Sequence, residues 1–310
     1  MSEGFHVCNR SRGHCPILVM SPEPSPIKRK RATKKDMEER AQFLISYARE
    51  HSPVTVRQLY YAAEVAEVSG IDKTEGSYKK VQGQVLKLRR EGRLDYGHIA
   101  DNSRWMRSGK TYGSPLEAAL EISRSYRKAL WADKEERVEV WVEKDALAGV
   151  IWPIAYDYDV HLAVTRGFCS ETFAWESAES HAESGKRVKV LYLGDFDRSG
   201  QDAMMNLKSK LYAFAGESGA DVEFINLAVT PEQIRKWKLP TREPKRTTPA
   251  DLKWPHPYAC ELDAIPPKEL RKLVENAIQY YLPARELEVL KTIEDQEKIQ
   301  METLFMGLGS

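Results

Sequence analysis

The sequence has few cysteines and no long apolar run. Its four cysteines, Cys8, Cys15, Cys169 and Cys260, are scattered over 310 residues, which argues against a disulfide framework and suits a reducing compartment. No apolar stretch is long enough to cross a bilayer, and the first twenty residues carry arginines and histidines where a secretory signal would need an apolar centre. We therefore expect a cytoplasmic protein with no membrane partner.

The charge of the chain is small but unevenly distributed. The net charge is +1, yet residues 1–130 hold 24 Lys and Arg against 15 Asp and Glu, whereas residues 131–310 hold 23 against 31. This division favours a phosphate-binding module followed by a carboxylate-lined metal domain, although chance clustering of surface charge would look the same. The length and an apolar content of 42% fit one large or two ordinary globular domains.

Residues 1–33 are predicted to be a disordered basic tail. They are polar, then proline-rich, and a run of four basic residues follows at 28–31. Such a run is a solvated arm or contacts DNA phosphates without sequence preference.

Residues 34–115 are predicted to form a DNA-binding domain that begins with three helices. The first runs from Lys34 to about Glu50. The second begins at Thr55, because Gln58 completes a capping box with it, and the third begins at Thr74. A small β-ribbon is expected over residues 92–99, which together with a basic third helix is typical of a winged-helix domain; a plain three-helix bundle is the alternative. The side chains expected to contact DNA are Lys79, Lys80, Lys87, Arg89 and Arg90.

Residues 116–230 alternate between strand and helix patterns. This alternation predicts a parallel sheet covered by helices on both faces, and so an α/β fold. The expected strands are Val138–Val142, Val160–Val164, Val188–Leu193 and Val222–Leu227. The expected helices are Leu116–Leu130, Ala146–Tyr156, Ser170–Glu183 and Gln201–Ala215. Residues 231–310 are expected to complete this domain or to form a dimer interface, with helices near 268–280 and 283–300.

Three acids follow two of these strands directly. Glu143 comes after V-E-V-W-V, and Asp195 and Asp197 come after V-L-Y-L-G. The carboxyl ends of parallel strands meet at one edge of a sheet, where three carboxylates would repel one another unless a cation compensated them. Because no histidine or cysteine accompanies them, oxygen ligands favour Mg²⁺ over zinc. The competing interpretation is that each acid only caps the helix that follows its strand.

The wider pattern around these acids resembles a known domain. The segments V-E-K-D-A-L-A, G-F-C-S and L-G-D-F-D-R-S-G resemble the Toprim domain of topoisomerases, primases and several nucleases, over about residues 137–227. The resemblance implies a Toprim domain in which Glu143, Asp195 and Asp197 hold magnesium.

A second resemblance lies in the basic half. The segment T-V-R-Q-L-Y-Y resembles the motif around the active tyrosine of the topoisomerase VI A subunit and the related meiotic double-strand-break protein. It implies that Tyr61 is the nucleophile and Arg57 its partner. Glu143 of the expected metal site is the third residue predicted to be catalytic. Helical spacing independently puts Tyr60 on the core stripe and Arg57, Tyr61 and Glu64 on another face.

The resemblance to this family also implies partners. It implies double-stranded DNA and nucleoid association, and a homodimer in which the tyrosine of one subunit works with the metal site of the other. A separate ATPase subunit of the B type is a further expected partner, since this chain has no recognisable ATPase portion. The chain departs from the family at Gln58, where an acid is usual, and at Phe196 and Arg198. The segment E-L-D-A-I-P-P-K-E-L resembles a stretch near the end of the compact A-like proteins, and Asp263 within it is interpreted as a helix-start or interface residue.

The predicted function is Mg²⁺-dependent DNA cleavage by tyrosine transesterification, which forms a 5′-phosphotyrosyl link. Two alternatives stay open from the sequence: a Toprim nuclease that hydrolyses DNA with water, and a catalytically silent DNA-binding protein.

Overall fold

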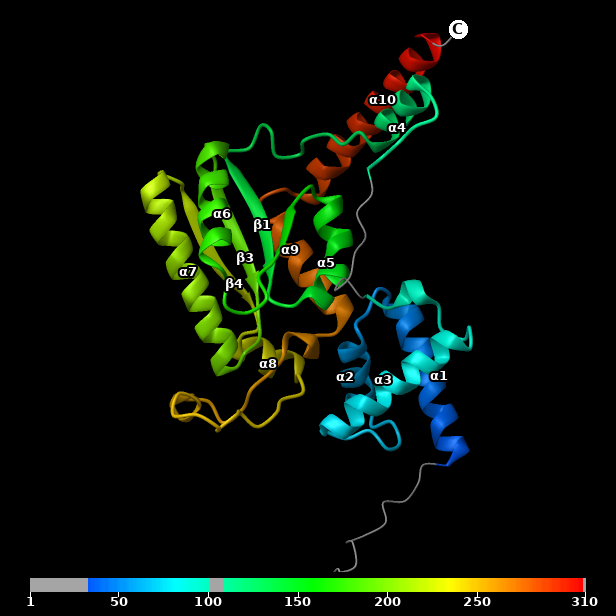
Figure 1. Cartoon of the computed structure of the whole chain (residues 1–310), viewed down its shortest axis with the longest axis vertical. Coiled ribbons are helices and arrows are strands. Elements are labelled where there is room, and N and C mark those ends of the chain that lie inside the picture. Colours follow the sequence, from blue (N-terminus) through cyan, green and yellow to red (C-terminus); the bar gives the residue numbers. More distant parts are fainter. Residues whose placement is uncertain (1–32, 101–108, 309–310) are drawn as a thin grey trace, which may run out of the picture.

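The chain is a mixed α/β protein, seen in a computed structural model that describes residues 33–100 and 109–308 (Figure 1). A helical module lies at one end of a parallel sheet, and a pair of helices projects from the other end. The predicted tail up to residue 32 lies outside the described residues, as does part of the connection after residue 100. No helix in the described ranges is both long and apolar enough to cross a membrane.

The helical module consists of α1 (Lys34–His51), α2 (Val56–Val65) and α3 (Glu75–Arg90). The predicted start of α2 is confirmed, because the Thr55 hydroxyl accepts the Gln58 N–H while the Gln58 side chain accepts the Thr55 N–H. The third helix is likewise capped by Thr74. Apolar faces of all three helices form one core, which includes Leu44, Leu59, Val81, Val85 and Leu88.

The expected β-ribbon over residues 92–99 is not formed, and that prediction is wrong. The segment instead contains a short 3₁₀ helix, η1 (Tyr96–His98), because the Asp95 side chain accepts the Gly97 N–H and turns the chain. Ile99 makes only a single parallel bridge, to Val54 in the connection between α1 and α2. A ribbon over residues 92–99 needs two extended segments within that stretch, and the stretch contains only the one at Ile99; the winged-helix assignment therefore stays a prediction.

The predicted parallel sheet is confirmed, with strand order β2-β1-β3-β4 and every pair parallel. Its strands are β1 (Glu136–Val142), β2 (His161–Val164), β3 (Arg187–Leu193) and β4 (Val222–Ala228). The helices between them are α5 (Asp145–Asp157), α6 (Glu171–Ser184) and α7 (Arg198–Ser218). All four strands and these three helices overlap the ranges expected from the sequence.

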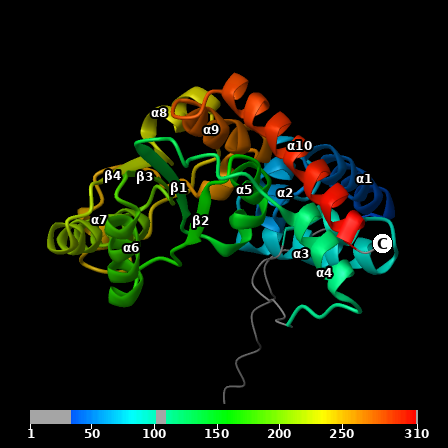
Figure 2. The same cartoon turned by 90° about the horizontal axis from the view of Figure 1, so that it is seen from above.

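Alternating side chains of the strands bury both faces of the sheet. Val138, Val140 and Val142 of β1 point to the face covered by α5 and α9 (Pro267–Gln279), where they join one core. Trp141 and Tyr192 point to the opposite face, covered by α6 and α7 (Figures 1 and 2). Burying a large apolar side chain in this way contributes about 1.5–3 kcal/mol each.

The C-terminal part adds elements that the sequence pattern predicted only in part. The helices α9 and α10 (Ala284–Leu308) were expected, whereas α8 (Pro231–Trp237) and the 3₁₀ helices η2 (Asp251–Lys253) and η3 (Leu262–Ala264) were not. The long helix α10 packs along α4 (Pro115–Ser125), and the pair projects away from the sheet (Figure 1).

Helix α4 ends at Ser125, five residues earlier than expected. The Ser123 and Ser125 hydroxyls donate to backbone carbonyls of the preceding turn, and the following residues leave the helix to bond α10. There the Lys128 N–H donates to Glu294 and the Tyr126 hydroxyl to Glu297.

Candidate metal and DNA site

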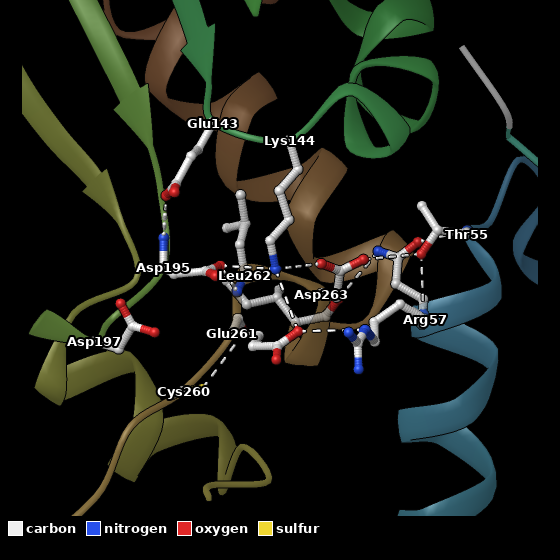
Figure 3. Close-up of polar contacts among 12 residues, drawn as sticks. Thr55, Arg57, Glu143, Lys144, Asp195, Asp197, Cys260, Glu261, Leu262 and Asp263 are labelled. Atoms are coloured by element: carbon white, nitrogen blue, oxygen red, sulfur yellow. Dashed lines mark hydrogen bonds and ion pairs between the residues drawn. The ribbon is translucent and has the colours of Figure 1, made fainter. Parts of the chain in front are cut away.

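Two of the three predicted acids meet at the carboxyl edge of the sheet. Strands β1 and β3 are neighbours, and the Glu143 N–H donates to the Leu193 carbonyl at 2.9 Å. The Asp195 N–H in turn donates to Glu143 Oε2 at 3.0 Å (Figure 3). Gly194 makes this approach possible, because a Cβ there would lie 2.9 Å from Glu143 Oε2 and 2.6 Å from the Tyr192 ring.

The third acid, Asp197, has two other partners. Its Oδ1 accepts the Gly200 N–H at 2.8 Å and caps α7, as the competing interpretation expected. Its Oδ2 pairs with Arg242 Nη2 at 3.0 Å. Among the residues that the structure describes, no three His, Cys, Asp or Glu side chains converge in the way that a metal ion requires. The three predicted ligands thus share one edge of the sheet, with Asp197 engaged by an arginine.

The donor set nevertheless fits a hard divalent cation. The Glu143 carboxylate forms no ion pair within the described ranges and accepts only the Asp195 N–H. Burial raises its pKa, and the neighbouring carboxylates of Asp195 and Asp197 push it the same way. A cation placed between carboxylate oxygens would relieve this repulsion, and oxygen donors are those that Mg²⁺ prefers.

A half-buried lysine that the sequence interpretation missed pairs with Asp195 and with two further acids, Glu261 and Asp263. Lys144 Nζ lies 3.0 Å from Asp195 Oδ1, 2.9 Å from Asp263 Oδ2 and 3.3 Å from Glu261 Oε2 (Figure 3). Burial alone would lower the pKa of Lys144, but the three carboxylates outweigh it and hold that pKa well above its ordinary value. Burial raises the pKa of Asp195 in spite of this lysine.

Glu261 forms ion pairs with cations from three separate parts of the chain. Its Oε1 pairs with Arg242 at 2.6 Å, and its Oε2 pairs with Lys144 and, at 3.4 Å, with Arg57 Nε of α2. Burial acts to raise the pKa of Glu261, yet these cations hold it below its ordinary value. The signal was present in the sequence, because Glu261 and Asp263 repeat the one-residue spacing of the earlier acid pair within an otherwise apolar segment.

The segment after residue 260 is also where α2 docks. The Thr55 hydroxyl donates to Asp263 Oδ1 at 3.0 Å, and the Gln58 side-chain amide donates to the Ile265 carbonyl at 3.3 Å. Asp263 thus lies where α2 meets the segment after residue 260. On the other side, a two-residue bridge between Phe196 and Cys260 fixes the same segment to the loop that carries the aspartates.

Tyr61 and Tyr60 lie as their helical spacing predicts. Tyr60 is buried and donates its hydroxyl to the Asp72 carbonyl at 3.0 Å. Tyr61 is half-buried, touches the cores of both the helical module and the sheet, and lines a mostly apolar groove of about 320 Å³ with Phe43 and Tyr47. Burial and then Glu261 raise the pKa of Tyr61 well above its ordinary value, and the nearby cations offset this only partly.

Arg57 has partners other than the expected one. Its guanidinium lies 4.1 Å above the ring centroid of Tyr78 and pairs with Glu261. The charge of Arg57 acts to lower the pKa of Tyr61, but burial of the tyrosine outweighs that effect.

The five basic side chains predicted to contact DNA lie along α3. Lys79, Lys80, Lys87 and Arg90 are exposed, and Arg89 is half-buried against the Tyr96 ring at 4.2 Å. Two are engaged locally: Lys80 donates to the Gly70 carbonyl, and Lys87 pairs with Glu91 within the helix. Nothing in their placement prevents a phosphate contact.

Comparison of the sequence with protein-family models found no match, and a search of curated proteins found none either.

Proposed function

We propose that the protein cuts DNA by Mg²⁺-dependent tyrosine transesterification, in the manner of the A subunit of a type IIB topoisomerase. The observation that carries the proposal is that Glu143 and Asp195 meet at one edge of the sheet, where the Asp195 N–H donates to Glu143 Oε2 at 3.0 Å. The tyrosine helix α2 is tied to the same edge through Arg57 and Glu261. The proposal includes a winged-helix-like DNA-binding module, a Toprim-like sheet and a homodimer.

The chemistry assigns distinct work to each residue. Glu143, Asp195 and Asp197 would hold Mg²⁺, which when bound stabilises negative charge on the departing sugar oxygen. The Tyr61 oxygen bonds to phosphorus while the bond from phosphorus to the 3′ oxygen breaks. The phenolic proton passes to water, the 3′ oxygen takes up a proton, and the 5′ phosphate stays on the enzyme. Arg57, once DNA competes for it, binds the phosphate under attack.

A second candidate is favoured by the surroundings of the tyrosine. The raised pKa of Tyr61 and the pairing of Arg57 with Glu261 both disfavour phenolate in this conformation. Hydrolysis by water at the same metal site, with Tyr61 only contacting the strand, would not need that phenolate.

The two candidates are separated by a denaturing cleavage assay. The protein is incubated with supercoiled plasmid and Mg²⁺, then denatured with and without protease before electrophoresis. Transesterification predicts protein attached to DNA 5′ ends in the wild type, loss of both cutting and attachment in Tyr61→Phe, and retention of both in Tyr60→Phe. Hydrolysis predicts free ends and cutting that survives Tyr61→Phe but not Glu143→Gln. Intact plasmid with every variant, including the wild type and with an ATPase partner added, would refute both.

A further inference from the structure

A dense group of basic residues lies in the acidic half of the chain, and all of them except Arg242 lie outside the site described above. Between residues 235 and 253 there are seven Lys and Arg against two Asp and Glu, a net charge of +5, although residues 131–310 as a whole are acidic. We call this group the α8 surface; it consists of Arg235, Lys236, Lys238, Arg242, Lys245, Arg246 and Lys253.

Most of these cations have no partner in the part of the chain that the structure describes. The six other than Arg242 are exposed and form neither an ion pair nor a side-chain hydrogen bond with described residues. Uncompensated like charges repel one another, so their grouping costs stability unless a polyanion neutralises them.

The loop that carries several of them is nevertheless well anchored. Asp251 is buried beneath it and accepts the Thr248 N–H at 2.9 Å and the Thr247 hydroxyl at 2.9 Å. The same carboxylate pairs with Arg198 Nε at 2.8 Å, at the start of α7. At the base of the loop, Arg242 and Ala259 exchange two backbone hydrogen bonds of 2.9 Å. The loop therefore presents Lys245 and Arg246 from a fixed base.

Arg242 connects this surface to the acids of the sheet edge. Its side chain is 39% exposed, whereas its two partners, Asp197 and Glu261, are 14% and 5% exposed. Glu261 also pairs with Arg57 of α2, so one carboxylate separates the α8 surface from the tyrosine helix. Figure 1 shows α8 and the loop after it at the same end of the sheet as the helical module.

We propose that the α8 surface binds the DNA phosphate backbone beside the sheet edge, with Arg242 as its innermost contact. It would hold the strand on one side of Glu143 and Asp195 while α3 holds it on the other. The adjacency to the candidate metal site favours DNA over an anionic membrane, which the same charges would also attract. The choice of DNA as the polyanion rests on the proposed function, whereas the inference that this surface binds a polyanion does not.

The test is equilibrium binding of a fluorescent DNA duplex in EDTA, so that neither metal nor cutting enters. The double variant Lys245→Gln/Arg246→Gln should weaken binding by roughly tenfold, and should reduce the slope of log K against log salt by about 2, one unit for each lost phosphate contact. The matched control is Lys272→Gln/Arg285→Gln, which removes two exposed cations of α9 and α10 that form no ion pair with any residue the structure describes, and it should leave both quantities unchanged.

Three outcomes would overturn the inference. One is an unchanged affinity and slope in the first variant, and another is an equal loss in the control. The third is weaker binding to phosphatidylserine vesicles with DNA binding intact, which would assign the surface to a membrane. If no cleavage occurs but the Lys245→Gln/Arg246→Gln variant still weakens DNA binding, the proposed function is refuted while the inference about the α8 surface is supported.

Discussion

Thr55 Oγ1 and Asp263 Oδ1 lie 3.0 Å apart although 208 residues separate them in the chain. Thr55 caps the helix that carries Tyr61, and the other oxygen of Asp263 accepts from Lys144, which directly follows Glu143. One carboxylate thus connects the start of the tyrosine helix to the acid edge of the sheet. Removing the Asp263 carboxylate should therefore lower the free energy of unfolding and also impair any chemistry at the sheet edge.

Asp263→Asn is predicted to destabilise the protein by about 2–4 kcal/mol, since it keeps an acceptor for Thr55 but leaves the half-buried Lys144 with two carboxylates in place of three. Urea unfolding measures the loss, and Asp263→Ala should cost more because Thr55 then loses its partner too. Equal midpoints for wild type and Asp263→Asn would contradict the assigned ion pair.

Arg242→Gln is predicted to tighten Mn²⁺ binding by about three- to tenfold, because it removes a cation that lies 3.0 Å from Asp197. The same change should weaken duplex binding in EDTA, since the side chain is proposed to contact phosphate. Electron paramagnetic resonance of free Mn²⁺ and fluorescence anisotropy measure the two effects. Weaker binding of both would mean that the arginine only supports the fold.

Gly194→Ala is predicted to cost about 1–3 kcal/mol and to displace the Glu143 carboxylate, because the added Cβ would lie 2.9 Å from Glu143 Oε2 and closer still to the Tyr192 ring. Metal-dependent cutting should fall with it. The matched control is Gly216→Ala inside α7, where a Cβ meets nothing within 4 Å and should stabilise the helix by about 0.5–1 kcal/mol. Thermal unfolding of both variants measures these effects. If Gly194→Ala were as stable as the wild type, the sheet edge would accommodate the added Cβ without a clash.

Glu139→Gln is predicted to lower stability near neutral pH but much less in acid. Glu139 is buried in β1 and accepts from Trp141 Nε1 at 3.0 Å and His181 Nε2 at 3.2 Å. Burial works to raise its pKa, yet hydrogen bonds with His161 and His181 hold that pKa well below its ordinary 4.5. A depressed pKa contributes stability above the unfolded value of about 4.5, and the contribution disappears as pH falls through the folded value.

The measurement for Glu139 is the free energy of unfolding of wild type and variant at several values between pH 7 and pH 3. The gap between them should be about 2–4 kcal/mol at pH 7 and should narrow below about pH 4. Glu217 provides a control, because it is exposed and has no ion-pair partner within residues 33–100 and 109–308, so Glu217→Gln should leave the pH dependence of stability unchanged. A gap that stays constant with pH would refute the linkage.

Local signals in the sequence predicted most of the fold. The capping box at Thr55 and Gln58 specifies the start of α2 within the chain itself, and the alternation of strand and helix patterns specifies the parallel sheet. The two acids that follow β1 and β3 meet because strand ends of a parallel sheet share an edge, which requires no knowledge of distant segments.

What the sequence did not predict depends on contacts between distant segments. Lys144, Arg242 and Glu261 lie in three separate stretches, and no periodicity indicates that they pair. The ion pair between Asp197 and Arg242 likewise joins two distant segments and has no local signal in the sequence. The β-ribbon expected over residues 92–99 fails for another reason: among the described residues Ile99 pairs only with Val54, which lies outside that stretch.

The backbone bridge between Phe196 and Cys260 holds the segment that carries Glu261 and Asp263 against the sheet edge, so the sheet domain does not end at its last strand. A fragment that stopped after β4 would keep all four strands of the sheet. It would lose the segment that Cys260 begins, and with it Glu261 and Asp263, so that the half-buried Lys144 would keep one of its three acidic partners. Truncation series would then score as inactive through misfolding rather than through loss of a catalytic group. A fragment for dissection also needs α1, whose Leu44 lies in the core that α2 and α3 share, so point substitutions report on individual residues where deletions cannot.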